Sequence, residues 1–229
     1  MCSAWKSEIA VDIGILGTGR VAQALAPHWL LGGHRVCFGS RDPDTRRAAL
    51  ESSLIQGLGA EAAAGLSWRP VDRCVEGSEI VVVAVPWDAA LASLEQLRDG
   101  RRRIVIDCIN PLRPDLKGKV IDDATSTLRV LQDHFPASDF VKAFNSASSA
   151  VMADSHFDQV PSMPICGDNE VARQRVAELV AAAGFEPIDC GDSLAATWLE
   201  AVTLLTIRMA IQNRWKGDCA VKWERRESR

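Results

Sequence analysis

Short apolar runs alternate along the chain with longer segments whose apolar residues recur at helical spacing. Buried strands are predicted for five of these runs, at 9–16, 36–39, 79–85, 104–109 and 140–144. Strands that alternate with helices form a mainly parallel sheet with helices on both faces, because every crossover has to return to the same edge of the sheet. Residues 1–145 therefore predict a doubly wound α/β sheet of Rossmann type.

The same alternation continues on a smaller scale after residue 145. Short strands are predicted at 163–166, 185–189 and 219–223, and Asp168 is expected to cap the helix between the first two. We therefore expect a Rossmann domain over residues 1–145 and a small C-terminal α/β portion over residues 146–229. This portion is expected to form the substrate side, either as a separate unit or packed into one compact unit with the first.

The longest predicted helix covers residues 194–212. One apolar stripe at helical spacing consists of Leu194, Trp198, Val202, Leu205 and Met209, and it is widened by Leu204, Ile207 and Ile211. A helix that is apolar over more than half of its circumference is buried on two sides. We expect this helix either to lie in the core beneath the site or to pair with a second subunit, which would make the protein a homodimer.

Glycines stand where the first predicted strand ends and the first helix begins. Gly17 and Gly19, followed by Ala22, give the spacing Gly-x-Gly-x-x-Ala directly after an apolar run. Glycine lets the backbone approach a pyrophosphate closely, and the helix N-terminus offers N–H groups and a partial positive charge. This setting predicts a dinucleotide site over the segment 17–21.

The residues at the end of the second predicted strand indicate whether the site suits NAD or NADP. Ser40 and Arg41 follow it, where an NAD site usually has an acidic residue for the ribose 2′-hydroxyl. A hydroxyl and a guanidinium suit a 2′-phosphate instead. The sequence thus predicts NADP(H) as the cofactor. Arg46 is expected either to add positive charge at the same phosphate or to face solvent on its helix.

Three further strand ends place candidate residues over the same edge of the sheet. Pro86 and Trp87 follow one strand, Asn110 and Pro111 follow the next, and Asn145 follows the last. Trp87 is expected either to lie along the nicotinamide ribose or ring or to be a core residue. Asn110 and Asn145 are candidates to orient the carboxamide or a substrate carbonyl, with an ordinary turn as the alternative for each.

Composition and charge narrow the class of protein. A formal net charge of -4 with mixed signs gives no basic surface for nucleic acid. The sequence shows no cationic start before an apolar stretch and no run of ~20 apolar residues, so we expect neither a secretory signal nor a membrane span. The seven cysteines are scattered and the four histidines lack ligand spacing. We therefore expect a cytoplasmic protein with free thiols and no metal site.

Residue types that the sequence lacks limit the chemistry. There is no tyrosine for a Tyr-Lys proton relay, and no lysine lies between Lys142 and Lys216, where a 3-hydroxyacid dehydrogenase would place its catalytic lysine. An NADP enzyme without an obvious proton donor favours a small-molecule hydride partner that needs little acid–base help, such as a second redox cofactor. A reductase of a small carbonyl or imine and an NADP-sensing module are the alternatives.

Several segments of the chain match a known pattern in order. They are Gly-Thr-Gly-Arg-Val at 17–21, Gly-Ser-Arg at 39–41, Val-Pro-Trp at 85–87, Lys-Ala-Phe-Asn at 142–145 and Gly-Phe-Glu-Pro-Ile-Asp-Cys-Gly at 184–191. In these segments the chain resembles the NADPH-dependent coenzyme F420 reductase family. The resemblance implies a Rossmann domain with a small C-terminal portion, commonly dimeric, that carries hydride between the nicotinamide C4 of NADP(H) and C5 of a deazaflavin.

The resemblance also implies roles for individual residues. It assigns the pyrophosphate to Thr18, Gly19, Arg20 and Val21, the 2′-phosphate to Ser40 and Arg41, the nicotinamide half to Trp87 and Leu91, and a place near the deazaflavin or nicotinamide to Ser149. The family's basic residue near Thr45 is absent, so Arg46 is expected to substitute for it. Where deazaflavin-using members carry His and Pro, this chain has Asn145 and Ser148.

Overall fold

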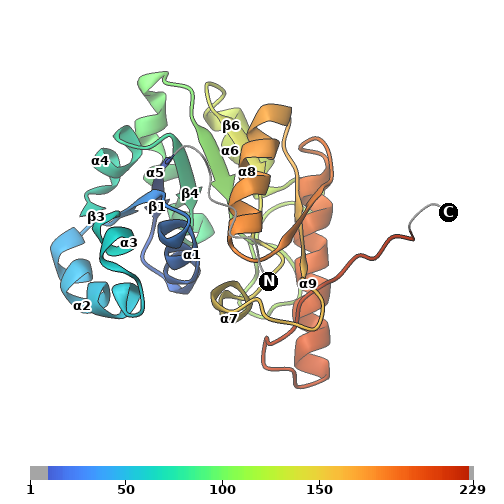
Figure 1. Ribbon diagram of the computed structural model, residues 1–229. Coiled ribbons are helices and arrows are strands. Elements are labelled where there is room, and N and C mark those ends of the chain that lie inside the picture. The colour runs from blue at the N-terminus through green and yellow to red at the C-terminus, as the bar shows by residue number, and fades with distance from the viewer. Residues whose placement is uncertain (1–9, 227–229) are drawn as a thin grey trace.

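The computed structural model of the protein describes residues 10–226 and is built around a six-stranded parallel sheet (Figure 1). The strands are β1 (Asp12–Leu16), β2 (Arg35–Gly39), β3 (Leu66–Arg69), β4 (Ile80–Val83), β5 (Ile104–Asp107) and β6 (Asp139–Lys142). They lie in the order β3-β2-β1-β4-β5-β6, which is that of a Rossmann fold and confirms the predicted fold class. A separate two-stranded sheet consists of β7 (Ser162–Ile165) and β8 (Glu186–Asp189). Ile9, the first residue of the predicted opening strand, lies outside the described residues.

Helices cover both faces of the main sheet. They are α1 (Arg20–Leu31), α2 (Pro43–Ile55), α3 (Ala60–Ala64), α4 (Val71–Glu76), α5 (Trp87–Ser93), the 3-10 helix η1 (Glu95–Asp99), α6 (Thr127–His134), α7 (Ser149–Ala153), α8 (Glu170–Ala182) and α9 (Ala195–Gln212). In β4, Ile80 and Val82 join the core against α1, whereas Val81 and Val83 join the core beneath α4, α5 and α6. A strand buried on both faces has to be apolar at every position, which is why it stands out as a continuous apolar run in the sequence.

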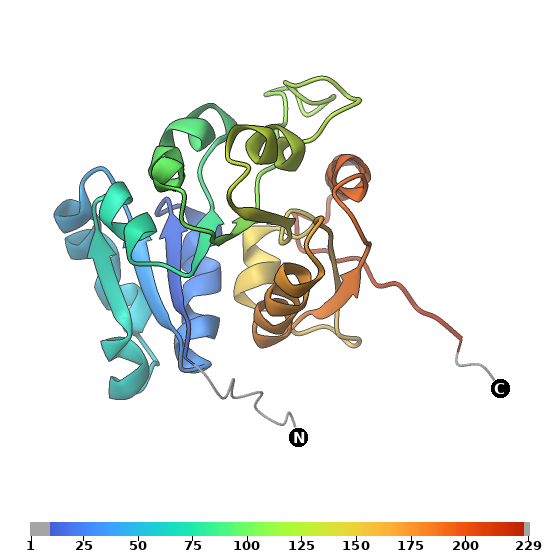
Figure 2. The same cartoon turned by 90° about the horizontal axis from the view of Figure 1, so that it is seen from above.

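The C-terminal portion packs beside β6. Two backbone hydrogen bonds between Lys142 and Cys166, of 2.8 and 3.2 Å, join the segment after β7 to the end of β6 (Figure 2). The indole N–H of Trp29 on α1 donates to the carbonyl of Leu179 on α8 (3.0 Å). Side chains from both portions thus share one apolar core. A division into two domains at residue 145 stays a prediction.

The apolar pattern failed to predict β3, and one predicted strand is wrong. β3 is an edge strand whose residues are half-buried or exposed, so it lacks the continuous apolar run that marks the inner strands. Residues 219–223 do not form a strand, because the hydrogen bond from the Ser162 N–H to the Val221 carbonyl (2.8 Å) is not continued into a ladder.

The predicted cap of α8 is also wrong. The cap is Asn169, whose side chain accepts a hydrogen bond from the N–H of Ala172 (3.0 Å). Asp168 instead accepts from the N–H of Ser193 (2.9 Å), just before α9. The neighbouring amide therefore takes the capping position, and the carboxylate connects two segments of the C-terminal portion.

One of the two arrangements expected for α9, burial of its apolar stripe in the core, is wrong. The buried residues of α9 are Ala195, Ala196, Leu199, Glu200, Thr203 and Ala210. In contrast, Trp198 is 67% exposed and Leu205 is 58% exposed. The second half of the helix extends beyond the rest of the fold (Figure 1). The apolar stripe is therefore open to solvent along one side of the helix.

A buried cluster of charges ties α9 to the main sheet. Lys142 on β6 is fully buried, and its Nζ lies 2.9 Å from Asp107 Oδ2 and 3.1 Å from Glu200 Oε1. The hydroxyl of Thr127 contacts the same two carboxylates at 2.6 and 3.0 Å, and Lys119 lies 3.2 Å from Glu200 Oε2. Burial alone would lower the pKa of Lys142, but Asp107 and Glu200 outweigh burial and raise that pKa. The lysine therefore stays charged inside the core.

Replacing Lys142 by methionine should destabilise the fold strongly, because Asp107 would remain buried without its charged partner and Glu200 would keep only Lys119. Breaking a buried ion pair from one side costs about 3–5 kcal/mol of unfolding free energy. Urea unfolding of Lys142→Met and of the unmodified chain measures the difference. Arg102→Ala removes an exposed ion pair with Asp139 and is the control, which should change the midpoint little. Equal losses of unfolding free energy in the two variants would contradict a stabilising role for the buried charge of Lys142.

Candidate functional site

A cavity of about 560 Å³ opens over the carboxyl ends of β1, β2 and β4. β1 and β4 are neighbours in the sheet, but the helices that follow them pack on opposite faces. The crevice at such a switch point is where open α/β sheets bind their ligands. The predicted site residues that line the cavity are Gly17, Thr18, Gly19, Ser40, Arg41, Arg46 and Pro86. The structure thus brings the glycine turn and the Ser-Arg pair together around one cavity.

Gly17 and Gly19 of the turn differ in what surrounds them. Gly17 has a φ of 100°, which L-residues rarely adopt, and a Cβ there would lie 2.7 Å from the carbonyl oxygen of Ala84. A Cβ on Gly19 would meet no atom within 4 Å. Because no side chain caps α1, the first N–H groups of the helix remain available to an anion. The turn therefore presents a bare helix N-terminus to open space.

Hydrogen bonds fix the backbone after β2. The N–H of Ser40 donates to the carbonyl of Arg69 at the end of β3 (3.0 Å), and Ser40 Oγ accepts from the N–H of Asp42 (3.1 Å). Asp42 in turn caps α2 by accepting from the N–H of Thr45 (3.2 Å). A hydroxyl that accepts one hydrogen bond still has its own proton to donate. Ser40 is thus held at the rim of the cavity with a donor left for a ligand oxygen.

Arg41 and Arg46 give this end of the cavity its positive charge. Both line the cavity and both are exposed. In the part of the chain that the structure describes, neither forms an ion pair, unlike Arg47 on the same helix, which pairs with Glu51 at 3.0 Å. A guanidinium presents a fork of N–H donors that fits a phosphate group. Two unpaired guanidinium groups beside Ser40 suit a phosphate better than a ribose hydroxyl.

One part of the cavity wall was not predicted from the sequence. Val71, at the start of α4, and the small residues Ala89, Ala92 and Ser93 of α5 line the cavity. Val71 follows β3, so no predicted strand end marked its position. For α5 there was a signal, because Ala89 lies three and four positions before Ala92 and Ser93 and these residues therefore share one face of the helix.

Some predicted site residues lie outside this cavity. They are Arg20, Val21, Trp87, Leu91, Asn110, Pro111, Asn145 and Ser149. Trp87 and Leu91 are half-buried and pack against the core beneath α4, α5 and α6. Ser149 is the half-buried first residue of α7. The contacts of these residues with a cofactor or substrate stay predictions.

Asn110 and Asn145 are joined by hydrogen bonds. Nδ2 of Asn110 donates to the backbone carbonyl of Asn145 (2.7 Å), and Nδ2 of Asn145 lies 3.1 Å from Asn110 Oδ1. Asn145 is buried, and its Nδ2 also lies within hydrogen-bond distance of Leu199 O (3.2 Å) and Thr203 Oγ1 (3.0 Å) on α9. The amide of Asn145 thus links the end of β6 to α9. Its expected role in orienting a substrate stays a prediction.

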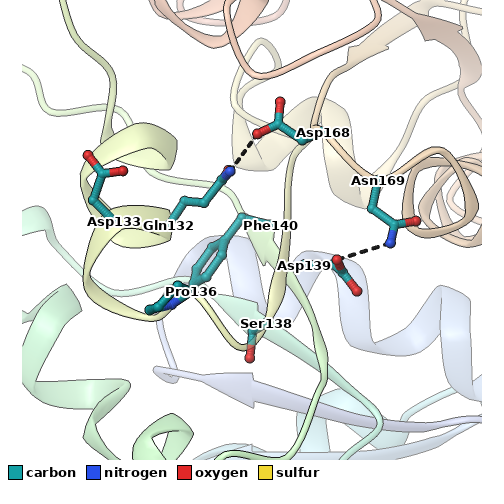
Figure 3. A pocket seen from close by; sticks show the side chains of 8 residues that line it. All are labelled: Gln132, Asp133, Pro136, Ser138, Asp139, Phe140, Asp168 and Asn169. Atoms are coloured by element: carbon teal, nitrogen blue, oxygen red, sulfur yellow. Dashed lines mark hydrogen bonds between the residues drawn. The ribbon is translucent and has the colours of Figure 1, made fainter.

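A second pocket, of about 320 Å³, lies at the amino end of β6, at the opposite end of the strand from Asn145 (Figure 3). Asp139 and Asp168 line it. Asn169 donates to Asp139 (3.0 Å), which also pairs with Arg102 (2.7 Å), and Gln132 donates to Asp168. Because these carboxylates already have partners within the protein, we assign no ligand to this pocket.

Within residues 10–226, no group of three or more His, Cys, Asp or Glu side chains is placed to hold a metal ion. None of the helices among these residues is long and apolar enough to cross a membrane. The six cysteines that they include are free thiols.

The Rossmann strand order, the bare helix N-terminus and the arginines at the cavity define a dinucleotide-binding protein. Residues 12–111 match the family described as NADP oxidoreductase coenzyme F420-dependent. The matched residues lie within the Rossmann part of the chain, and the match confirms the resemblance seen in its motifs.

The chain is similar to proteins of two kinds. The chain is 33% identical over 197 residues to the Metalloreductase STEAP3 of Rattus norvegicus, a match that covers 85% of this chain but only 37% of that relative. It is 27% identical over 217 residues to the F420-dependent NADP reductase of Methanocaldococcus jannaschii, a match that covers 90% of this chain and 96% of that relative. The chain thus spans little more than a third of the first relative and nearly all of the second.

Solved structures support the same fold. A candidate F420-dependent NADP reductase from Arthrobacter sp. FB24 superposes with a TM-score of 0.81 at 25% identity, and the match covers 94% of this chain and all of that one. An imine reductase from Myxococcus stipitatus superposes with a TM-score of 0.63 at 14% identity, covering 91% of this chain and 64% of that one. The second likeness shows the fold alone.

Proposed function

We propose that the protein is an NADP(H)-dependent oxidoreductase that exchanges hydride with a deazaflavin, coenzyme F420. The observation that carries the proposal is the cavity over the strand ends, where Ser40, Arg41 and Arg46 surround the place expected for a 2′-phosphate. Further support comes from the reductase of Methanocaldococcus jannaschii, which this chain matches over almost the whole length of both proteins.

The residues that line the cavity fit NADPH. The pyrophosphate would lie over Gly19, where the space is open, and accept hydrogen bonds from the first N–H groups of α1. The 2′-phosphate would pair with Arg41 and Arg46 and accept from the Ser40 hydroxyl. When bound, NADPH supplies the hydride at its nicotinamide ring.

The chain's own contribution to catalysis is to hold two rings in position. Trp87 and Leu91 lie on α5, whose neighbouring residues line the cavity, and we assign them to the nicotinamide side. Ser149, at the start of α7, is assigned to the second ring. A hydride partner that is itself a redox ring needs no proton donor from the protein, which agrees with the absence of tyrosine. Orientation of the two rings would then be the main source of rate enhancement.

We also propose that the protein is a cytoplasmic homodimer with α9 at its interface. Leu194, Trp198, Leu205 and Met209 recur at helical spacing, and each is exposed in the single chain. Exposed apolar side chains gathered on one helix mark an interaction site, and a helix that pairs with its own copy would bury them on both chains at once. The free thiols of the described residues fit a reducing compartment.

Arg41→Ala should weaken NADPH binding by about 10- to 100-fold, because it removes a charge-assisted hydrogen bond to the 2′-phosphate. NADH lacks that phosphate, so its affinity should change little. Titration of the variant with each nucleotide measures both effects. Arg47→Ala, on the same helix but paired with Glu51, is the matched control and should leave both affinities unchanged. Equal losses for NADPH and NADH in Arg41→Ala would rule out the phosphate role.

The identity of the hydride partner is tested by mixing the protein with NADPH and oxidised coenzyme F420 and following the deazaflavin's absorbance. We expect rapid bleaching with NADPH and much slower bleaching with NADH. Tight NADPH binding without bleaching would contradict the deazaflavin and make a small carbonyl or imine the acceptor. Tight binding without reduction of any of these acceptors would indicate an NADP-sensing module instead.

A further inference from the structure

Two cysteines meet on the sheet face that carries α4. In the register of the strands, Gly14 on β1, Cys37 on β2 and Ser67 on β3 form one row across the sheet. Partners in register on parallel strands point to the same face. Cys37 therefore stands between a glycine on one side and a hydroxyl on the other, beneath α4.

Cys74 of α4 fills the hollow left by Gly14 of this row and by Gly39 at the end of β2. A Cβ on Gly14 would lie 2.9 Å from Cys74 Sγ, and a Cβ on Gly39 would lie 3.2 Å from the same sulfur. Cys74 Sγ also donates a hydrogen bond to the backbone carbonyl of Cys37 (3.3 Å). Since Cys37 lies in register with Gly14 and two residues before Gly39, the two thiols are neighbours.

A surface pocket gives small molecules access to this pair. A pocket of about 250 Å³ is lined by both cysteines together with Ser67, Arg69 and Arg35. Cys37 is half-buried at this pocket, whereas Cys74 is buried behind it. A reagent in solution therefore reaches Cys37 first.

The surroundings of Cys37 favour its thiolate. The Cys74 thiol, the Ser67 hydroxyl and the guanidinium of Arg69 stabilise the negative sulfur and lower the pKa of Cys37 to about 7. Burial of Cys37 opposes this effect, and Asp12 opposes it to a smaller extent, with its carboxylate engaged by Arg35 (2.6 Å). The pKa of Cys74 is raised, because the Cys37 sulfur and burial both disfavour a second thiolate. One reactive thiolate thus lies beside one protonated thiol, the arrangement of an attacking and a resolving cysteine.

We propose that Cys37 and Cys74 form a redox-active dithiol that is oxidised by low-molecular-weight disulfides such as glutathione disulfide. The Cys37 thiolate attacks one sulfur of that disulfide, a mixed disulfide forms and one glutathione thiolate leaves. Cys74 then loses its proton to water, and its thiolate attacks the Cys37 sulfur and expels the second glutathione thiolate. Two protein thiols are oxidised to one disulfide, and glutathione disulfide is reduced to two glutathione molecules.

Closing this disulfide would act on the proposed cofactor cavity. Cys74 packs against Gly39, the residue before Ser40, and its helix begins with Val71, which lines the cavity. Pulling Cys74 towards Cys37 shifts α4 relative to the end of β2. We therefore expect the oxidised protein to bind NADPH more weakly than the reduced protein, an expectation that rests on the proposed function.

The test exposes the full chain to glutathione disulfide and locates the modified cysteines by mass spectrometry. The unmodified chain should form an internal Cys37–Cys74 disulfide and lose two hydrogen atoms. Cys74→Ser should stop at a glutathione adduct on Cys37, and Cys37→Ser should leave Cys74 unreacted. Cys190 is the control thiol, because the residue is exposed to solvent while partial desolvation of its sulfur and the neighbouring Asp189 raise its pKa. Cys190→Ser should therefore leave disulfide formation unchanged.

Preferential modification of Cys190, or the absence of a Cys37 adduct in Cys74→Ser, would overturn the proposal. A readout independent of the chemistry is the NADPH affinity of the oxidised and reduced chains, with Cys74→Ser as the reference that cannot close the disulfide. A lower affinity in the oxidised chain alone supports the link to the cavity. An unchanged affinity would refute that link while the mapped disulfide stands, and the proposed cofactor is judged separately by the affinity of the reduced chain.

Discussion

The close approach of the β1–α1 turn to the end of β4 is the constraint on which the site depends. Gly17 adopts a positive φ and lies so near Ala84 that a Cβ would clash with the backbone carbonyl. This contact directs the N-terminus of α1 into the crevice between β1 and β4, where the helices change faces. The proposed anion site at the helix N-terminus and the position of Ser40 and Arg41 beside it both follow from that arrangement.

The C-terminal portion is attached to this frame by buried polar groups as well as by apolar packing. Lys142, Asp107 and Glu200 join β5, β6 and α9, and the amide of Asn145 adds contacts from the end of β6 to Thr203. Buried charges and amides are costly to leave without partners, so they restrict α9 to one position against the strand ends. The fold thereby holds α9 next to the edge of the sheet where the dinucleotide is proposed to bind.

Features that depend on local residue types could be predicted from the sequence. Gly17, Gly19 and the Ser40–Arg41 pair were recognisable because a positive φ, an open helix N-terminus and a phosphate each demand particular residues at fixed spacing. Features that depend on distant partners could not. The contact of Asn145 with Thr203 joins residues 58 positions apart. An edge strand such as β3 lacks an apolar run. The apolar stripe of α9 indicates a face suited to burial, but it does not identify what would cover that face.

We infer that the cavity over the strand ends binds NADP(H) through its 2′-phosphate. The most direct measurement is a calorimetric titration of the unmodified chain with NADP⁺ and, separately, with NAD⁺ at two salt concentrations. We expect NADP⁺ to bind at least about tenfold more tightly, because only NADP⁺ has a 2′-phosphate to pair with Arg41 and Arg46, and we expect salt to reduce the difference. Equal affinities, or tighter binding of NAD⁺, would contradict recognition of the 2′-phosphate at this cavity.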